Sequence, residues 1–114
     1  MGTKEKIKVV LNELGVPHHL KGYTFIKQAV TMLAEDKSYR NGIVNRLYVD
    51  VATECGDTTP SRIERAIRHA VEWVFKNTDV DVIEKYFGNS VDIRKGKVSN
   101  KHFLITLADY VLGY

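Results

Sequence analysis

The stretch from Thr59 to Val74 constrains the fold more than any other part of the chain, because it describes one amphipathic helix with a defined start. Thr59 followed by Pro60 is typical of an N-cap and a first helical residue. At 3.6 residues per turn, one side of this helix collects the apolar residues Ile63, Ala66, Ile67, Ala70 and Val74. The opposite side collects the polar residues Arg65, Arg68, His69 and Glu72, with Arg62 at its edge. Such a helix must bury its apolar back and leave its charged side in solvent.

Apolar periodicity in the rest of the chain predicts further helices. They extend over about 3–14, 22–35 and 43–54 before the arginine-bearing helix at about 59–76. A short helix opened by Asp79 and ended by Gly88 follows, and Ser99 opens a last helix. Residues 90–98 have no helical period, and we expect an exposed loop there. The pattern predicts an all-α fold, a compact bundle of about six helices forming a single domain over residues 1–114.

Composition limits the classes of function. With 114 residues, 44% of them hydrophobic and 27% charged, the chain resembles an ordinary globular domain. No apolar run reaches the roughly 18 residues that cross a bilayer, so we expect a cytoplasmic protein without membrane contact. Cys55 is the only cysteine, which excludes an internal disulfide and a four-cysteine zinc site. The net charge of +3 is compatible with nucleic acid as a partner.

The predicted helices at about 43–54 and 59–76, joined by a short turn containing Gly56, match the plan of a helix-turn-helix over about 43–76. A guanidinium can hold a guanine edge or a phosphate through two parallel hydrogen bonds. A helix N-terminus also attracts phosphate, and the hydroxyls of Thr58, Thr59 and Ser61 stand there. The hypothesis is therefore a reader of double-stranded DNA.

Simpler interpretations stand beside this hypothesis. The charged side of the helix could be solvated surface held by the ion pairs Glu64–Arg68 and Arg68–Glu72. His18 and His19 are adjacent and point in different directions, so we expect no metal site and no cofactor. Cys55 lacks a surrounding active-site motif, and we expect no enzyme. The basic run 94–97 is expected to be a solvated loop, with contact to phosphates as the alternative.

Several stretches together resemble the C-terminal effector domain of the stage zero sporulation protein A family, response regulators of endospore formation. The closest similarity lies in Leu14–Pro17, His19–Tyr23 and Thr58–Ala70. Weaker similarity continues through Tyr86–Gly88, Ser99–Asn100 and Ala108–Asp109, so the resemblance covers about residues 9–112. It implies a six-helix domain whose fourth helix reads a TGTCGAA-like box in the major groove.

The resemblance also implies roles for residues and partners. Arg62, Glu64 and Arg65 match the base-reading positions, and Ser61, Arg68 and His69 match positions that contact the DNA backbone. The implied partners are double-stranded DNA, a second copy on tandem boxes, the sigma factor of RNA polymerase and an N-terminal receiver domain that takes phosphate from a phosphorelay.

Two departures from the family pattern leave an alternative open. The turn 55–57 is one residue longer than usual and contains Asp57, and the segment 77–80 lacks the glycine expected in the sigma-contacting region. The alternative is a helical protein-interaction domain of the same scaffold that has lost DNA binding.

Overall fold

The arrangement of the helices follows from one apolar stripe on each of them. The computed structural model describes residues 2–88 and 98–113, which form helices and no strand. The α-helices are α1 (Thr3–Glu13), α2 (Lys21–Glu35), α3 (Tyr48–Cys55), α4 (Pro60–Asn77), α5 (Val80–Phe87) and α6 (Asn100–Leu112). The all-α fold expected from the sequence is confirmed, and the loop expected at 90–98, with its basic run 94–97, falls almost wholly outside the described residues.

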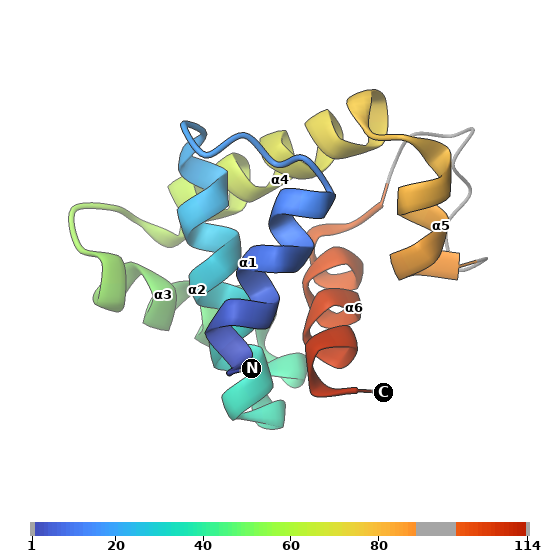
Figure 1. The fold of residues 1–114 in the computed structure, drawn as a ribbon. Helices are drawn as coiled ribbons and strands as arrows, with labels where there is room; N and C mark the ends of the chain where they lie inside the picture. Colours follow the sequence, from blue (N-terminus) through green and yellow to red (C-terminus); the bar gives the residue numbers. More distant parts are fainter. Residues whose placement is uncertain (1, 89–97, 114) are drawn as a thin grey trace.

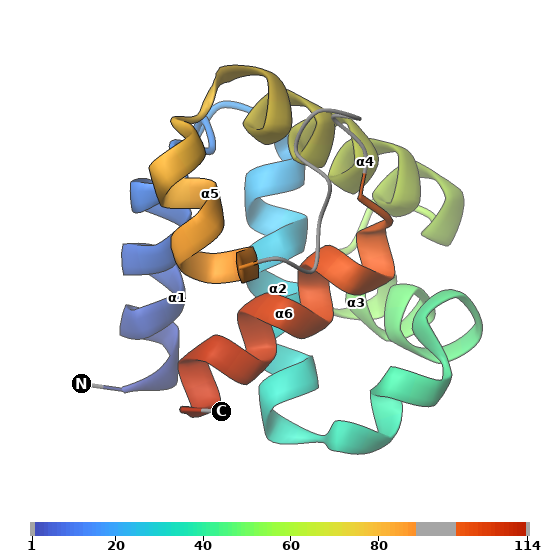
Figure 2. The ribbon, with the colours of Figure 1, turned by 90° about the vertical axis from the view of Figure 1, so that its right-hand side faces the viewer.

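Helix α2 is the centre of the fold, since it packs against α1, α4 and α6. Figure 1 shows α4 lying across one end of the layer formed by α1, α2 and α6, with α3 on one side and α5 on the other. Figure 2 shows the same arrangement from the side of α5 and α6. One buried hydrophobic cluster receives side chains from all six α-helices. The long helix α4 is thus supported from behind along most of its length.

The close approach of α2 and α4 depends on a glycine. A Cβ atom at Gly22 would lie 2.5 Å from the carbonyl oxygen of Ala66 and 2.7 Å from the Cβ of Ala70. Real Cβ atoms essentially never show contacts under 3.0 Å. Any other residue at position 22 would push the two helices apart, so Gly22 fixes the distance between α2 and α4.

The segment before α3 differs from the continuous helix expected at about 43–54. A 3₁₀-helix covers Lys37–Asn41, a π-helical turn covers Ile43–Leu47, and only then does α3 begin. In the π turn the amide of Leu47 donates to the carbonyl of Gly42, five residues back, at 2.8 Å. The phenol of Tyr39 donates a hydrogen bond to Asp50 of α3, and the Arg46 guanidinium lies 4.8 Å from the Tyr39 ring. These contacts hold the segment against α3. The energies that favour the π turn come from tertiary contacts, which the apolar pattern along the chain does not report. The pattern therefore predicted one uninterrupted helix.

Most of the expected helix ends are confirmed. Gly15 follows the end of α1 in a left-handed conformation (φ 75°), and the Ser99 hydroxyl oxygen accepts the amide hydrogen of His102 at the start of α6. The prediction that Asp79 caps α5 is correct in position only, because its side chain accepts no capping hydrogen bond. None of the helices that the structure describes is long and apolar enough to cross a bilayer.

Candidate nucleic-acid interface

Helices α3 and α4 are joined by a short turn, residues 56–59, whose backbone needs a glycine. Gly56 has φ 73° and Asp57 has φ 50°, both in the left-handed region. Glycine enters this region at no steric cost, and aspartate tolerates it better than most residues. The two helices pack against each other beyond the turn. The pair is consistent with the helix-turn-helix expected from the sequence.

The start of α4 is fixed by Thr59 and Pro60. The Thr59 backbone is extended, and its hydroxyl oxygen accepts the backbone hydrogen of Arg62 at 3.2 Å. Pro60 occupies the first helical position, where a missing N–H costs nothing. The helix therefore begins at this cap.

The division of α4 into two sides is as the sequence predicted except at Ala66, which was expected on the buried side but is only partly buried and lines a groove beside the helix. The buried side consists of Ile63, Ile67, Ala70, Val71, Val74 and Phe75. The polar residues exposed on the other side are Ser61, Arg62, Arg65, Arg68 and His69 in the first half of the helix, followed by Glu72, Lys76 and Asn77. The solvent-exposed face of the first half of α4 is therefore dominated by guanidinium groups.

Glu64 lies at the border between the two sides. Its carboxylate is 3.8 Å from the Arg68 guanidinium, with the two side chains 45% and 54% exposed. This is a long, solvated pair. The second expected pair, Arg68–Glu72, does not form among the described residues, and Arg62 and Arg65 make no ion pair there either. The interpretation of this side as a surface held by ion pairs is thus supported at one position only.

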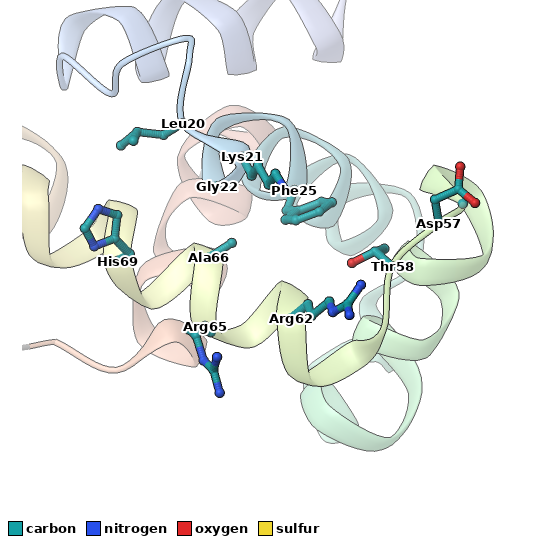
Figure 3. A pocket seen from close by; sticks show the side chains of 11 residues that line it. Leu20, Lys21, Gly22, Phe25, Asp57, Thr58, Arg62, Arg65, Ala66 and His69 are labelled. Atoms are coloured by element: carbon teal, nitrogen blue, oxygen red, sulfur yellow. The ribbon is translucent and has the colours of Figure 1, made fainter.

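A groove of about 630 Å³ runs between the start of α2, the turn before α4 and the exposed side of α4. Figure 3 shows Arg62 and Arg65 extending from α4 in different directions, with Arg65 directed away from α2. The lining of the groove includes four residues with basic side chains, Lys21, Arg62, Arg65 and His69, and one acid, Asp57. A concave surface with this charge favours an anionic ligand.

The groove brings together some of the expected site residues and adds others. Thr58, Arg62, Arg65 and His69 line it, whereas Thr59, Ser61, Glu64 and Arg68 lie outside it. Sequence reasoning assigned no role to the residues that α2 and its approach contribute, namely Leu20, Lys21, Gly22 and Phe25. Phe25 is only partly buried, because it forms part of this wall. Helical periodicity could not show that α2 begins beside α4.

His18 and Cys55, the other side chains that could bind a metal or act as a nucleophile, lie outside the groove. The His18 ring is hydrogen bonded to Asn12 at 2.7 Å and stacks on Tyr23 with ring centroids 4.3 Å apart. Desolvation and the neighbouring Glu54 carboxylate raise the pKa of the thiol of the exposed Cys55, which keeps it protonated at neutral pH. Within residues 2–88 and 98–113, no three potential metal ligands lie together.

The fold and this surface define a class: a small all-helical domain that presents an arginine-bearing helix after a short turn. Residues 7–111 of the chain match the family model described as the C-terminal domain of the sporulation initiation factor Spo0A. The chain belongs to this family, whose members are DNA-binding effector domains of sporulation response regulators. The resemblance seen over about residues 9–112 is thereby confirmed.

Proposed function

We propose that the chain is a sequence-specific binder of double-stranded DNA that places α4 in the major groove of a TGTCGAA-like box. One observation carries the proposal: the side chains of Arg62 and Arg65 are exposed, while Ile63 and Ile67 on the back of the same helix are completely buried. The helix is therefore held rigidly and offers its guanidinium groups to a partner. A major groove about 12 Å wide admits a helix of this kind.

Base reading is assigned to Arg62, Glu64 and Arg65. The two guanidinium groups can each bind the O6 and N7 atoms of a guanine through parallel hydrogen bonds. Glu64 either accepts a hydrogen from a cytosine amino group or orients Arg68, and its position 3.8 Å from the Arg68 guanidinium supports the second role.

Contacts to the DNA backbone are assigned to Thr58, Thr59, Ser61, Arg68 and His69. The first three stand at the N-terminus of α4, where unpaired amides favour phosphate. The Thr59 oxygen is occupied as an acceptor by the Arg62 amide, but the hydroxyl hydrogen can still be donated to a phosphate oxygen. Phosphate contacts set the register of a protein on DNA without reading its sequence.

The test is selection of preferred sites from a random duplex pool, followed by Arg65→Ala on the selected site. A TGTCGAA-like consensus is expected from the parent. Loss of one bidentate base contact should cost about 1–3 kcal/mol and relax the preference at a single base pair. Lys76→Ala is the matched control, an exposed cation in the last turn of α4. Equal affinities of Arg65→Ala and the parent for the selected site would refute the base-reading assignment.

The second candidate function is a helical protein-interaction domain that has lost DNA binding. Two features favour it: the acid Asp57 in the turn before α4, and the apolar side chains Val44 and Val49, which are 57% and 43% exposed next to and on α3. Titration of salt against binding to a random duplex separates the candidates. A DNA binder loses affinity steeply as salt rises, whereas a protein-interaction domain shows no binding even at low salt.

The remaining parts of the proposal concern the whole regulator. We expect residues 1–114 to act as one effector domain in the cytoplasm, without catalytic activity or cofactor, controlled by an N-terminal receiver domain in the parent protein. Two copies are expected on tandem boxes, and the sigma factor of RNA polymerase is the expected partner in activation. The stoichiometry of the complex with a duplex carrying one or two boxes tests the tandem arrangement.

A further inference from the structure

The first residue of α6 joins both helices of the α3–α4 pair through one side-chain amide. Asn100 Nδ2 lies 3.2 Å from the phenol oxygen of Tyr48 on α3 and 3.0 Å from the backbone carbonyl oxygen of Glu64 on α4. A carbonyl oxygen only accepts hydrogen bonds, so the NH₂ group must face Glu64. Its two hydrogens can serve both partners at once.

Both partners are placed where the angle between α3 and α4 is set. Tyr48 opens α3 and is 1% exposed, and burial raises the pKa of its phenol, which therefore remains neutral. Glu64 lies in the second turn of α4, directly before Arg65. The backbone of Asn100 is itself fixed by the Ser99 cap of α6. A rigid donor thus connects the buried base of one helix with the backbone of the other.

The opposite end of α4 has an anchor of the same kind. The Thr78 hydroxyl, at the C-cap, donates to the carbonyl oxygen of Leu14 after α1 at 2.6 Å. Arg65 lies 13 residues before Thr78, which is about 20 Å along a helix rising 1.5 Å per residue. If only the Thr78 anchor held α4, a tilt of about 3° would displace Arg65 by about 1 Å. A displacement of this size breaks bidentate hydrogen-bond geometry.

We infer that Asn100 is a positioning residue for DNA recognition, which sets the height and tilt of the N-terminal half of α4 without touching DNA. The inference rests on the proposed function and deepens it, because it assigns part of the sequence specificity to a residue on another helix. The hydrogen bonds of Asn100 therefore contribute more to discrimination between cognate and other duplexes than to general affinity for DNA.

The experiment compares the affinity of the parent and the variants for a duplex carrying the selected box and for a scrambled duplex of equal length, at one salt concentration. Asn100→Ala removes both hydrogen bonds. Asn100→Asp keeps the shape, places a favourable charge at the start of α6 and cannot donate to Glu64 when ionised. Both variants should bind the box about tenfold more weakly and the scrambled duplex within about twofold of the parent.

Thr78→Val is the matched control, since it removes a side-chain bond to a backbone carbonyl from the far end of α4. It should leave the ratio of the two affinities unchanged, because Arg65 lies next to the Asn100 anchor. Circular dichroism spectra establish that each variant is folded at the assay temperature.

The outcomes separate the inference from the function on which it rests. A parent that does not distinguish the two duplexes would overturn the proposed function and this inference together. A parent that discriminates, with Asn100 variants that discriminate equally well, would overturn the inference alone. Equal loss on both duplexes, or failure of both Asn100 variants to fold, would also overturn it, since Asn100 would then serve the fold as a whole.

Discussion

Replacement of Gly22 by alanine tests how closely α2 and α4 are packed. The added methyl group would lie 2.5 Å from the Ala66 carbonyl oxygen, which belongs to the α4 backbone and cannot rotate away. It would also lie 2.7 Å from the Ala70 Cβ. Relief of both contacts requires the helices to move apart by about 1 Å, since ordinary contacts begin at about 3.4 Å.

Two opposing contributions decide the size of the effect. Alanine in place of glycine favours a helix by up to about 1 kcal/mol. Overpacking of a well-packed contact costs about 1–3 kcal/mol, and the rigid backbone partner places Gly22→Ala at the upper end. The net expectation is a loss of about 2 kcal/mol in the free energy of unfolding. For a domain of this size that corresponds to a decrease of about 8 °C in Tm.

Urea denaturation followed by circular dichroism measures this loss. Gly2→Ser is the control, because a Cβ at Gly2 meets no atom within 4 Å and serine is also a favourable residue at this N-cap of α1, so its midpoint should not fall below that of the parent. The affinity of Gly22→Ala for the selected duplex should fall as well, since α4 is displaced from its support. A midpoint for Gly22→Ala equal to or above that of the parent would contradict the close approach of α2 and α4.

Three further predictions address the cap, the charges and the pH dependence. Thr59→Ala removes the acceptor for the Arg62 amide and should lower the free energy of unfolding by about 1 kcal/mol in urea denaturation; an unchanged midpoint would contradict the cap. Arg68→Ala should weaken binding similarly on all duplexes and make the salt dependence shallower, whereas a base-selective loss would reassign Arg68 to base reading. The hydrogen bond from Lys85 to Glu13 at 2.7 Å lowers the pKa of the Glu13 carboxyl below its ordinary value of 4.5. A carboxyl group whose pKa is lower in the folded state than in the unfolded chain stabilises the fold above the unfolded pKa. This stabilisation is lost as the pH falls through the folded pKa. Glu13→Gln should therefore flatten the acid limb of a plot of urea midpoint against pH, and an identical limb would contradict the bond.

The sequence predicted the features of this fold that depend on neighbouring residues along the chain. The apolar stripe of α4 and its start at Thr59 follow from a 3.6-residue period and from the local chemistry of a cap. The end of α1 near Gly15 is set by a residue that tolerates positive φ. Each of these signals lies within about one helical turn, which is why a single sequence is sufficient to find it.

The features that the sequence did not predict depend on contacts between residues that lie more than one helical turn apart in the sequence. The π turn before α3 is held by Tyr39 and Arg46, whose partners become neighbours only after folding. The groove beside α4 exists because Gly22 lets α2 approach, and a glycine near a helix start can equally well serve a turn or a cap. The bonds of Asn100 reach residues 52 and 36 positions away. No periodicity or capping rule reports contacts of this kind.

The ion pairing of the arginines on the charged side of α4 bears on whether this side is a solvated surface held by ion pairs or a DNA-binding surface. A surface that merely stabilises its own helix would engage its arginines with neighbouring carboxylates, yet the Glu64–Arg68 contact is long and more than two fifths of each side chain is exposed. Exposed pairs spaced by four residues on a helix contribute only about 0.3–0.5 kcal/mol. Exchange of this pair for a phosphate or a base edge therefore costs little. Arg62 and Arg65, which form no ion pair within the described part of the chain, need no such exchange. Recognition of an anionic duplex requires arginine side chains on a rigidly supported helix that form few ion pairs within the domain. The stability of α4 itself does not require such an arrangement.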